Sequence, residues 1–313
     1  MNSVAVIGAG WSGVTAALKL SRAGLKVTLF EAARIAGGRA RRVERDGRVI
    51  DNGQHLLLGA YERTLSTIRS LHPAGNIPLI TLPLVLESAP DTALPLQLQT
   101  PNIREPLNLL IGLLTAKGLS GTEKGATIYW ASRTLNGGTV DASLTVSALI
   151  ASQPIKIRAL MWEPLCIAAL NTPPETASAA VFVEVLRRTF SGTRNASQML
   201  IPESDLTTLL PEPALAEVVA NGGEVFLGSA VVNVREMQRR VSVALREGSK
   251  DFDAVIVAVA PQHVPRLLAD EASTAAVVAA LECVTYEPIT TLYFEFSYAA
   301  PSPHEGSPMR MLD

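Results

Sequence analysis

The sequence predicts an α/β fold in which a mostly parallel sheet is interrupted by an inserted α+β domain. An apolar strand at residues 3–7 runs into a glycine-rich turn, a helical pattern follows until Gly24, and a second apolar strand occupies residues 27–31. A strand, a crossover helix and a second strand in this order form a βαβ unit with parallel strands. Apolar strands return late in the chain, at residues 225–234, 241–245 and 254–259.

The turn after the first strand has the pattern of a dinucleotide-binding loop, Gly8-Ala9-Gly10-Trp11-Ser12-Gly13. Gly8 permits a tight turn, Gly10 lets the backbone approach a pyrophosphate, and Gly13 lets the helix pack against the strand. The helix N-terminus then presents unpaired N–H groups and a positive dipole end to the phosphates. Glu31 ends the second strand, eighteen residues after Gly13, where an acid accepts hydrogen bonds from a ribose diol and repels a 2′-phosphate. This context predicts a Rossmann-like domain that binds a dinucleotide other than NADP.

A second glycine segment, Gly37-Gly38-Arg39, follows six residues after Glu31. Two adjacent glycines let another stretch of backbone approach the dinucleotide, and Arg39 can offer a forked cation to a phosphate. NAD-binding domains do not generally carry this element, so its presence favours FAD over NAD. The alternative is an ordinary loop.

A dense polar run, Asp51-Asn52-Gly53-Gln54-His55, precedes three leucines. Beside a flavin ring, such a run would supply hydrogen-bond donors and acceptors. The alternative is a capped turn, because Asn-Gly is a strong turn signal, His55 can satisfy a backbone carbonyl, and Asp51 can accept from backbone N–H groups.

Composition changes at Pro73, after which prolines recur until Pro106 and indicate loops and short strands that enter a second domain. Helical patterns follow at residues 106–115, 142–151, 156–170 and 177–190, and an alternating strand pattern at 290–296. We therefore predict an FAD-binding domain made of two segments and a substrate domain made of the rest. The predicted boundaries are 1–72 and 222–272 for the FAD-binding domain, and 73–221 and 273–313 for the substrate domain.

Bulk composition narrows the functional classes. The net charge of −2 gives no electrostatic basis for nucleic-acid binding. Two distant cysteines and four scattered histidines indicate neither a disulfide framework nor a metal site. The N-terminus lacks the features of a signal peptide, and the longest apolar run, 107–114, is too short to span a bilayer. We expect a cytoplasmic protein with a peripheral contact at the inner face of the cell membrane.

The segment 106–119 is the candidate for that contact. Its apolar residues recur at helical spacing on one face, and cations lie at both ends of the segment. A buried core helix would show the same spacing, so both interpretations stay open. The apolar positions are Leu107, Leu110, Ile111 and Leu114, and the flanking cations are Arg104 and Lys117.

Three strings carry a family resemblance: VAVIGAGWSG, TLFEAARIAGGRARR and DNGQHLLLGAY. Together they resemble the flavin amine oxidase and desaturase superfamily. The third string is more specific and is similar to the hydroxysqualene dehydroxylase family, the squalene-associated FAD-dependent desaturases of bacterial hopanoid pathways. The resemblance continues through residues 161–179, 196–206, 222–234 and 253–261.

The resemblance implies that FAD is the cofactor. The ADP half would be held by Gly8, Gly10, Gly13 and Glu31, with Trp11 and Ser12 in the same loop. The pyrophosphate side would be lined by Gly37, Gly38 and Arg39, and Gly53 would lie near the flavin. In the superfamily a valine on the first returning strand binds adenine through its backbone, and Val231 best fits that position. A plain core valine is the alternative for Val231.

The family resemblance implies reductive removal of the hydroxyl group of hydroxysqualene, a triterpene alcohol, to give squalene. Reduced FAD would give a hydride to an allylic carbon as the hydroxyl leaves. A departing hydroxide needs a proton, and His55 and Asp51 are the candidate donors. The alternatives are a carotenoid- or phytoene-type desaturase and an amine oxidase. The sequence does not identify the electron donor.

The family also implies a C-terminal flavin motif that lies beyond Asp313, where this chain stops. On this resemblance we expect a truncated member of the family. A flavin-binding remnant without activity is therefore a further alternative.

Overall fold

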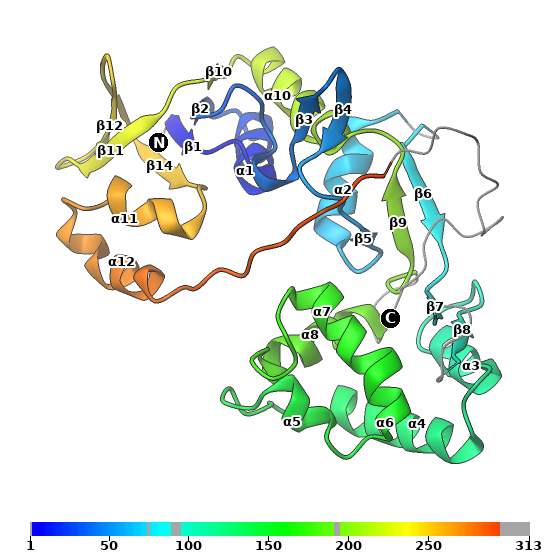
Figure 1. Cartoon of the computed structure of the whole chain (residues 1–313). Coiled ribbons are helices and arrows are strands. Elements are labelled where there is room, and N and C mark those ends of the chain that lie inside the picture. Colours follow the sequence, from blue (N-terminus) through cyan, green and yellow to red (C-terminus); the bar gives the residue numbers. More distant parts are fainter. Residues whose placement is uncertain (1, 74–75, 89–94, 191–194, 295–313) are drawn as a thin grey trace. The chain divides into compact units, whose positions relative to one another are not determined.

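The computed structural model describes residues 2–73, 76–88, 95–190 and 195–294, and its contacts divide the chain into two compact units (Figure 1). The first unit comprises Met1–His55, Arg63–Leu79 and Pro202–Tyr286. The second comprises Leu56–Glu62, Ile80–Ile201 and Glu287–Asp313.

A four-stranded parallel sheet in the order β10-β2-β1-β14 forms the centre of the first unit. Val6 pairs with Leu29 on one side and with Ile256 on the other, so segments from both ends of the described chain share one sheet. This confirms the predicted α/β class and the mostly parallel sheet. The strands are β1 (Ser3–Ile7), β2 (Lys26–Glu31), β10 (Glu224–Leu227) and β14 (Ala254–Val257).

Helices pack beside this sheet. The longest in the first unit, α1, buries Val14, Ala17 and Leu18 completely and packs along α10. Apolar burial of this kind stabilises a helix far more than intrinsic propensity does. The helices of this unit are α1 (Trp11–Arg22), α2 (Glu62–Leu71), α9 (Leu206–Leu209), α10 (Pro211–Ala220), α11 (Val264–Leu267) and α12 (Ala275–Glu282).

The predicted hairpin after the glycine segments is present as β3 (Arg42–Arg45) and β4 (Arg48–Asp51). Its turn residues Asp46 and Gly47 have φ angles of 52° and 73°. Positive φ at both positions is the type I′ geometry that suits the twist of a two-residue hairpin. The Asp-Gly signal in the sequence therefore predicts this turn correctly.

The strand predicted over residues 225–234 is wrong in extent. The chain leaves the parallel sheet after β10, turns at Gly228 with φ of 70°, and begins β11 in a separate antiparallel sheet. The sequence signals this break only weakly, because apolar residues lie on both sides of Gly228 and Ser229. The antiparallel sheet contains β11 (Val231–Glu236), β12 (Val241–Leu245) and β13 (Gly248–Phe252).

The second unit is mostly helical around one apolar core. Trp130 and Trp162 lie with ring centroids 4.7 Å apart, and Phe182 is fully buried beside them in the same core. Burial raises the pKa of the Cys166 thiol to about 11, so this cysteine is an inert core residue. The helices are α3 (Leu107–Thr115), α4 (Gly121–Asn136), α5 (Val146–Ile150), α6 (Ile155–Ile157), α7 (Glu163–Leu170) and α8 (Ala179–Phe190), with a π-helical turn (Arg158–Trp162) between α6 and α7.

Short strands complete the second unit. Three of them, β6, β7 and β8, lie within the proline-rich segment as predicted, whereas β5 precedes it and β9 follows it. They form two small sheets, one of which runs in the order β5-β9-β6. Residues 290–294, within the predicted strand 290–296, are not in a strand, and residues 295 and 296 lie outside the described part. The strands are β5 (Leu57–Leu58), β6 (Leu79–Leu82), β7 (Val85–Glu87), β8 (Gln97–Gln99) and β9 (Met199–Pro202).

The two units divide the chain differently from the predicted domains. Residues 202–221 and 273–286 belong to the first unit, whereas the sequence analysis assigns both to the substrate domain. The first difference arises because α10 packs on α1, where Arg22 donates to both carboxylate oxygens of Glu217 at 2.6 and 2.7 Å. The assignment of cofactor and substrate roles to separate domains stays a prediction.

None of the helices in the described segments is long and apolar enough to cross a membrane.

The packing of α1 on β1 predicts that Gly13 tolerates no side chain. A Cβ at Gly13 would lie 1.9 Å from the carbonyl oxygen of Gly8. We expect Gly13→Ala to fail to fold or to lose many degrees of thermal stability in an unfolding scan. Gly125→Ala is the matched helical control, because no atom lies within 4 Å of its added Cβ, and it should raise stability by roughly 0.5–1 kcal/mol. Equal melting temperatures for the two variants would contradict this packing.

Candidate dinucleotide-binding site

The first glycine loop is fixed by its own backbone. The Gly8 N–H donates to the Phe30 carbonyl at 2.7 Å, which ties the loop to β2. Gly8 has φ of 103°, and a Cβ there would lie 2.8 Å from the carbonyl oxygen of Ala258. Only glycine fits this position, as the sequence pattern predicts.

The N-terminus of α1 is open to an anion. Gly10 is the N-cap and offers no side-chain acceptor, and the first turn contains no acidic residue. Ser12 is exposed, whereas the indole Nε1 of Trp11 is buried and has no partner within the described residues. The helix start therefore combines N–H groups that no side chain caps with a positive dipole end.

The two glycine segments are in direct contact. The Gly37 N–H donates to the Ala9 carbonyl at 2.7 Å, and Gly10 and Gly37 form a parallel bridge. A Cβ on Gly38 would lie 3.0 Å from the Cα of Gly10. Gly37 and Gly38 have φ angles of 119° and 62°, so both the conformation and the close approach require glycine. The structure thus brings together the two segments that the sequence analysis assigns to one cofactor.

Arg39 lies at the edge of this contact. Its side chain is exposed, and no acidic side chain of the described residues pairs with it. Asn52 donates from Nδ2 to the Arg39 carbonyl at 3.3 Å, and Arg41 donates to the Gly38 carbonyl at 2.9 Å. The backbone of the second segment is therefore anchored, while the Arg39 guanidinium remains available for a phosphate.

Glu31 is held at the end of β2 by backbone donors. One carboxylate oxygen accepts from the Ala9 N–H at 2.6 Å, and the other accepts from the Ala33 N–H at 2.8 Å. A carboxylate has about four acceptor sites, so both oxygens can still accept from ribose hydroxyls. Glu31 thus also connects the first glycine loop to the segment that follows β2, a role that its spacing alone does not reveal.

Val231 begins β11, and its side chain belongs to the core of the first unit, with 6% exposed. The loop before it lies against the end of β2, since the Ser229 N–H donates to the Glu31 carbonyl at 2.8 Å and the Gly228 N–H donates to the Ala33 carbonyl at 2.9 Å. The side chain therefore has the core role that the alternative interpretation predicts. Binding of adenine by the Val231 backbone stays a prediction.

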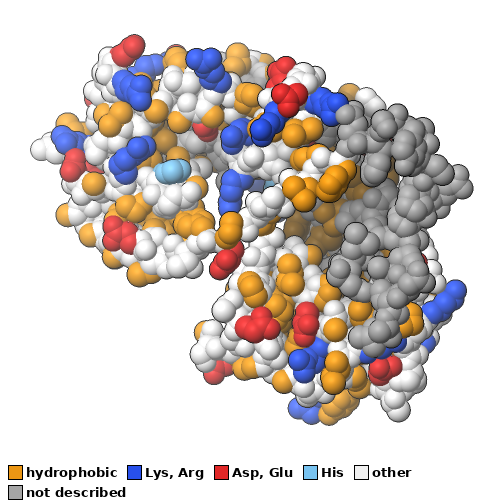
Figure 2. All heavy atoms as spheres, viewed as in Figure 1, with side chains coloured by type: hydrophobic (Ala, Val, Ile, Leu, Met, Phe, Trp, Pro, Cys, Tyr) orange, Lys and Arg blue, Asp and Glu red, His pale blue; other side chains and the backbone are white. Residues whose placement is uncertain are grey.

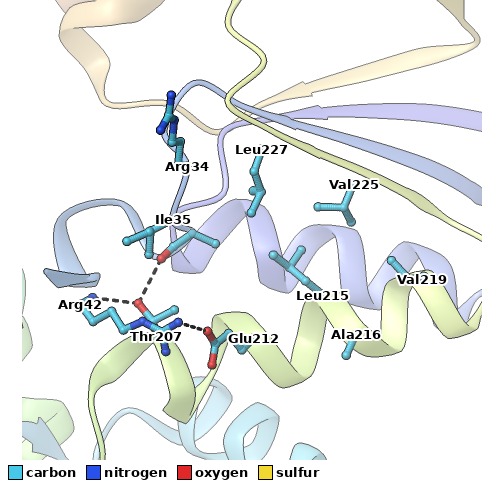
Figure 3. A pocket seen from close by; sticks show the side chains of 11 residues that line it. Arg34, Ile35, Arg42, Thr207, Glu212, Leu215, Ala216, Val219, Val225 and Leu227 are labelled. Atoms are coloured by element: carbon cyan, nitrogen blue, oxygen red, sulfur yellow. Dashed lines mark hydrogen bonds and ion pairs between the residues drawn. The ribbon is translucent and has the colours of Figure 1, made fainter. Parts of the chain in front are cut away.

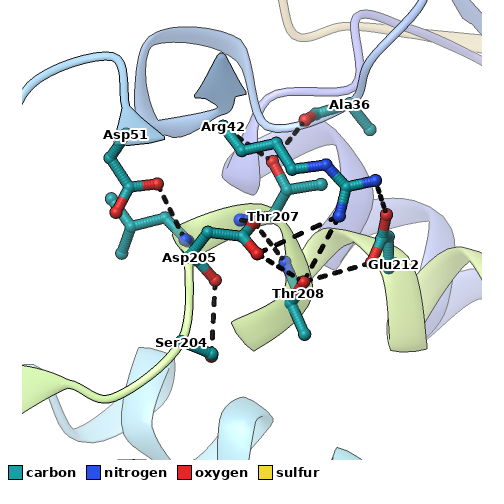
Figure 4. Close-up of polar contacts among 9 residues, drawn as sticks. Ala36, Arg42, Asp51, Ser204, Asp205, Thr207, Thr208 and Glu212 are labelled. Carbon is teal, nitrogen blue, oxygen red and sulfur yellow. Dashed lines mark hydrogen bonds and ion pairs between the residues drawn. The ribbon is translucent and has the colours of Figure 1, made fainter. Parts of the chain in front are cut away.

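Asp51 caps a helix. Its Oδ1 accepts from the Leu206 N–H at 2.9 Å, while Asp205 accepts from the next two N–H groups of α9 at 3.0 Å each (Figure 4). Two carboxylates thus satisfy the first three donors of this helix. Asp51 therefore makes the structural contact predicted as the alternative to a catalytic role.

His55 also makes the contact that its structural alternative predicts. Its Nδ1 donates to the Gly53 carbonyl at 2.8 Å, within a turn where Gly53 has φ of 95°. The Gly53 N–H in turn donates to the Asp51 carbonyl at 2.8 Å. The polar run is therefore an ordered turn, and its part in proton transfer stays a prediction.

Thr207 is a site residue that sequence reasoning missed. Its hydroxyl donates to the Ala36 carbonyl at 3.1 Å and accepts from the Arg42 N–H at 2.8 Å, and the residue is only 1% exposed (Figure 4). It thereby fixes both ends of the second glycine segment. Asp205, as an N-cap before an apolar run, signals the helix in the sequence, but no local pattern links Thr207 to Ala36.

A pocket of about 480 Å³ opens in the first unit between α10, β10 and the segment around Arg34, and Ala36, Arg42 and Thr207, which border the second glycine segment, are among its lining residues (Figure 3). Its walls are mostly apolar, and the nearby Arg42 guanidinium is already paired with Glu212 at 2.6 Å. None of its lining residues belongs to the predicted cofactor set. We therefore place the candidate site at the glycine segments, where open N–H groups and an unpaired cation converge.

These residues fit a bound dinucleotide. The uncapped start of α1 and the Arg39 cation suit a diphosphate. Because Gly10 and Gly38 have no Cβ atoms, the cofactor can approach the backbone closely. The buried Trp11 indole N–H lacks an acceptor among the described residues, and a cofactor can supply one.

Comparison with known families agrees with this geometry. The family described as NAD(P)-binding Rossmann-like domain matches residues 6–71, and the family described as flavin containing amine oxidoreductase matches residues 196–308. Over 289 residues the chain is 34% identical to hydroxysqualene dehydroxylase of Rhodopseudomonas palustris, covering 85% of this chain and 63% of the relative. The corresponding protein of Sinorhizobium fredii is 30% identical over 285 residues with the same coverage. Over most of its length the chain is therefore similar to hydroxysqualene dehydroxylases, and these matches support that family.

The chain spans about 63% of the length of these two hydroxysqualene dehydroxylases. Among solved structures, an oxidoreductase of Methanosarcina mazei superposes with a TM-score of 0.64 at 19% identity, covering 90% of this chain and 64% of that one. At this identity the superposition shows a shared fold. Together with the flavin-containing family match, the second glycine segment identifies the dinucleotide as FAD.

The position of Thr207 predicts an effect on cofactor affinity. Thr207→Val keeps the shape but leaves the Arg42 N–H and the Ala36 carbonyl without their partner, which costs about 1–3 kcal/mol for each buried group. We expect lower thermal stability and weaker FAD binding in a fluorescence titration. The control is Thr208→Val, because the Thr208 hydroxyl contacts only the side chains of Asp205, Glu212 and Arg42 and no backbone group of the glycine segment. An unchanged FAD affinity in a folded Thr207→Val variant would show that this anchor is dispensable.

Proposed function

We propose that the protein is an FAD-dependent oxidoreductase that reductively removes the hydroxyl group of hydroxysqualene to give squalene. The observation that carries the proposal is the direct contact between the two glycine segments. It occurs in a chain that matches two proteins named hydroxysqualene dehydroxylase over 85% of its own length. Those relatives do not favour a carotenoid-type desaturase or an amine oxidase.

Bound reduced FAD would supply the hydride that replaces the hydroxyl, so that alcohol and reduced flavin give hydrocarbon, water and oxidised flavin. The residues of the chain bind FAD and orient it. The N-terminus of α1 and Arg39 hold the diphosphate, Glu31 binds the ribose of the ADP half, and the Val231 backbone binds adenine. The electron donor that reduces the flavin is not identified by these residues.

The leaving hydroxide takes up a proton, for which Asp51 and His55 are the candidate donors. Burial raises the pKa of the Asp51 carboxyl, the hydrogen bond from the Leu206 N–H opposes this, and the charge of Asp205 adds to the increase. The charge of His55 also acts to lower this pKa, and the net effect is a pKa above the ordinary value for aspartate. A raised pKa suits a proton donor, and the same carboxyl also caps α9.

A triterpene alcohol is a long hydrocarbon that partitions out of water into lipid. We therefore propose that the protein meets its substrate at the inner face of the cell membrane, as a peripheral protein.

The direct test is anaerobic incubation of photoreduced, FAD-loaded protein with hydroxysqualene in detergent, followed by chromatography for squalene. We expect stoichiometric squalene and oxidation of the flavin absorbance. Protein that holds reduced FAD and yields no squalene would contradict the proposed reaction.

The Asp51→Asn variant separates the two roles of this residue. The amide oxygen can still accept from the Leu206 N–H, so α9 should stay capped and FAD affinity should change little. If Asp51 donates the proton, the single-turnover rate should fall by roughly tenfold to a thousandfold, in line with the usual gain from general acid catalysis. Its pH dependence should also flatten. A rate within twofold of the parent would exclude Asp51 and leave His55→Gln as the remaining test.

A further inference from the structure

Helix α3 carries its apolar side chains outward. Leu107, Leu110, Ile111 and Leu114 are 57%, 38%, 39% and 53% exposed. They recur at the spacing of one helical face, and we refer to these four residues as the α3 face. An ordinary surface helix would turn this stripe into the core. The inward side of α3 instead carries the small and polar residues Asn108 and Gly112, together with Leu113.

A buried polar network holds the helix in this orientation. Asn108 is 3% exposed and donates from Nδ2 to the Ser197 hydroxyl at 2.8 Å. The Ser197 hydroxyl and N–H both donate to Glu105 at 2.9 and 3.0 Å, and the Asn195 N–H donates to the other Glu105 oxygen at 2.8 Å. Removing one member would leave buried polar atoms without partners, so the helix cannot rotate its apolar stripe inward at low cost.

Glu105 stays charged inside this network. Burial acts to raise the pKa of its carboxyl, but the hydrogen bonds from the Ser197 and Asn195 amides and from the Ser197 hydroxyl together lower it below the ordinary value. An ionised carboxylate with buried donors fixes the polar side of α3 to the interior.

Gly112 fixes the helix from the same side. A Cβ there would lie 3.1 Å from the Gln99 carbonyl oxygen, so the α3 backbone packs directly on β8. The outward position of the α3 face is therefore imposed by packing on its inner side as well as by hydrogen bonds.

Basic residues border the α3 face. Arg104 and Lys117 are exposed beyond its two ends. Lys124 donates to the Leu114 carbonyl at 2.7 Å, and Lys156 donates to the Gly118 carbonyl, which brings two more cations to the C-terminal end of the helix. On the side of the second unit drawn in Figure 2, hydrophobic side chains lie among both basic and acidic ones.

The acids of this region offset those cations only in part. Between residues 101 and 124 they are Glu105, which is buried, and Glu123, which accepts from the Ser120 N–H in the capping box of α4 and lies within electrostatic reach of Lys156. Four cations thus face two carboxylates. The border of the α3 face is therefore positively charged.

We propose that the α3 face docks on the surface of an anionic phospholipid bilayer. An apolar stripe bordered by cations matches the interfacial region of such a bilayer, where leucines enter the acyl boundary and lysines meet the headgroup charge. A nine-residue helix is about 14 Å long, which is small for a stable protein interface of about 800 Å² per partner. The biological use of this docking, delivery of an insoluble substrate, rests on the proposed function, whereas the surface itself does not.

The test is flotation of the full chain with vesicles of phosphatidylcholine, with and without phosphatidylglycerol. We expect flotation with the anionic vesicles, less with the neutral ones, and weakening as salt rises. Leu114→Glu should reduce the bound fraction by roughly tenfold or more, since it places a charge where the exposed leucine would enter the bilayer. Val181→Glu is the matched control, because Val181 is 52% exposed on α8 of the same unit and should not affect flotation.

Circular dichroism and thermal unfolding establish that both variants are folded. Equal flotation of folded Leu114→Glu and Val181→Glu, or no flotation of the parent, would overturn the proposal. A Leu114→Glu variant that changes from dimer to monomer in light scattering while its flotation is unchanged would assign the face to a second copy instead. Flotation needs neither hydroxysqualene nor flavin reduction. Failure of the squalene assay would therefore not contradict the docking proposal, and failure of flotation would not contradict the proposed reaction.

Discussion

The cofactor site depends on one backbone contact, the hydrogen bond from the Gly37 N–H to the Ala9 carbonyl at 2.7 Å. This bond joins two loops that leave different strands, and it is possible only because Gly38 can approach the Cα of Gly10 to within van der Waals contact. With the two loops joined, the segment that carries Arg39 lies beside the N-terminus of α1, where an anion would bind. Without this contact the first loop would be a general dinucleotide motif, and nothing in it would distinguish FAD from NAD.

The surrounding structure holds the second glycine segment in place from outside the βαβ unit. Thr207 bonds to the chain at Ala36 and Arg42, on either side of the segment, and the helix that carries Thr207 is capped by Asp205 and Asp51. A residue first considered for catalysis therefore stabilises the same site structurally. Capping and proton donation are compatible, because a protonated carboxyl keeps acceptor capacity for the Leu206 N–H.

Local patterns in the sequence predict the parts of the fold that are determined by the backbone conformation of neighbouring residues. The glycine spacing predicts the loop and α1, and Asp46-Gly47 predicts the hairpin turn, because each requires specific backbone angles at named positions. The break at Gly228 is missed because apolar strand-like residues lie on both sides of it. The orientation of α3 cannot follow from periodicity, since the same spacing serves a buried or an exposed face. What decides it is Asn108, whose partner Ser197 is distant in sequence.

The central claim is that the two glycine segments form one site for FAD. Isothermal titration of the purified chain with FAD and with NAD, repeated on Gly38→Ala, tests it most directly. The Gly38→Ala substitution places a Cβ 3.0 Å from the Gly10 Cα at a position with φ of 62°, so it should separate the segments without touching Glu31 or the first loop. We predict that the parent binds FAD more tightly than NAD and that Gly38→Ala loses FAD affinity while remaining folded. Tight NAD binding without FAD binding, or an unchanged FAD affinity in Gly38→Ala, would contradict the account.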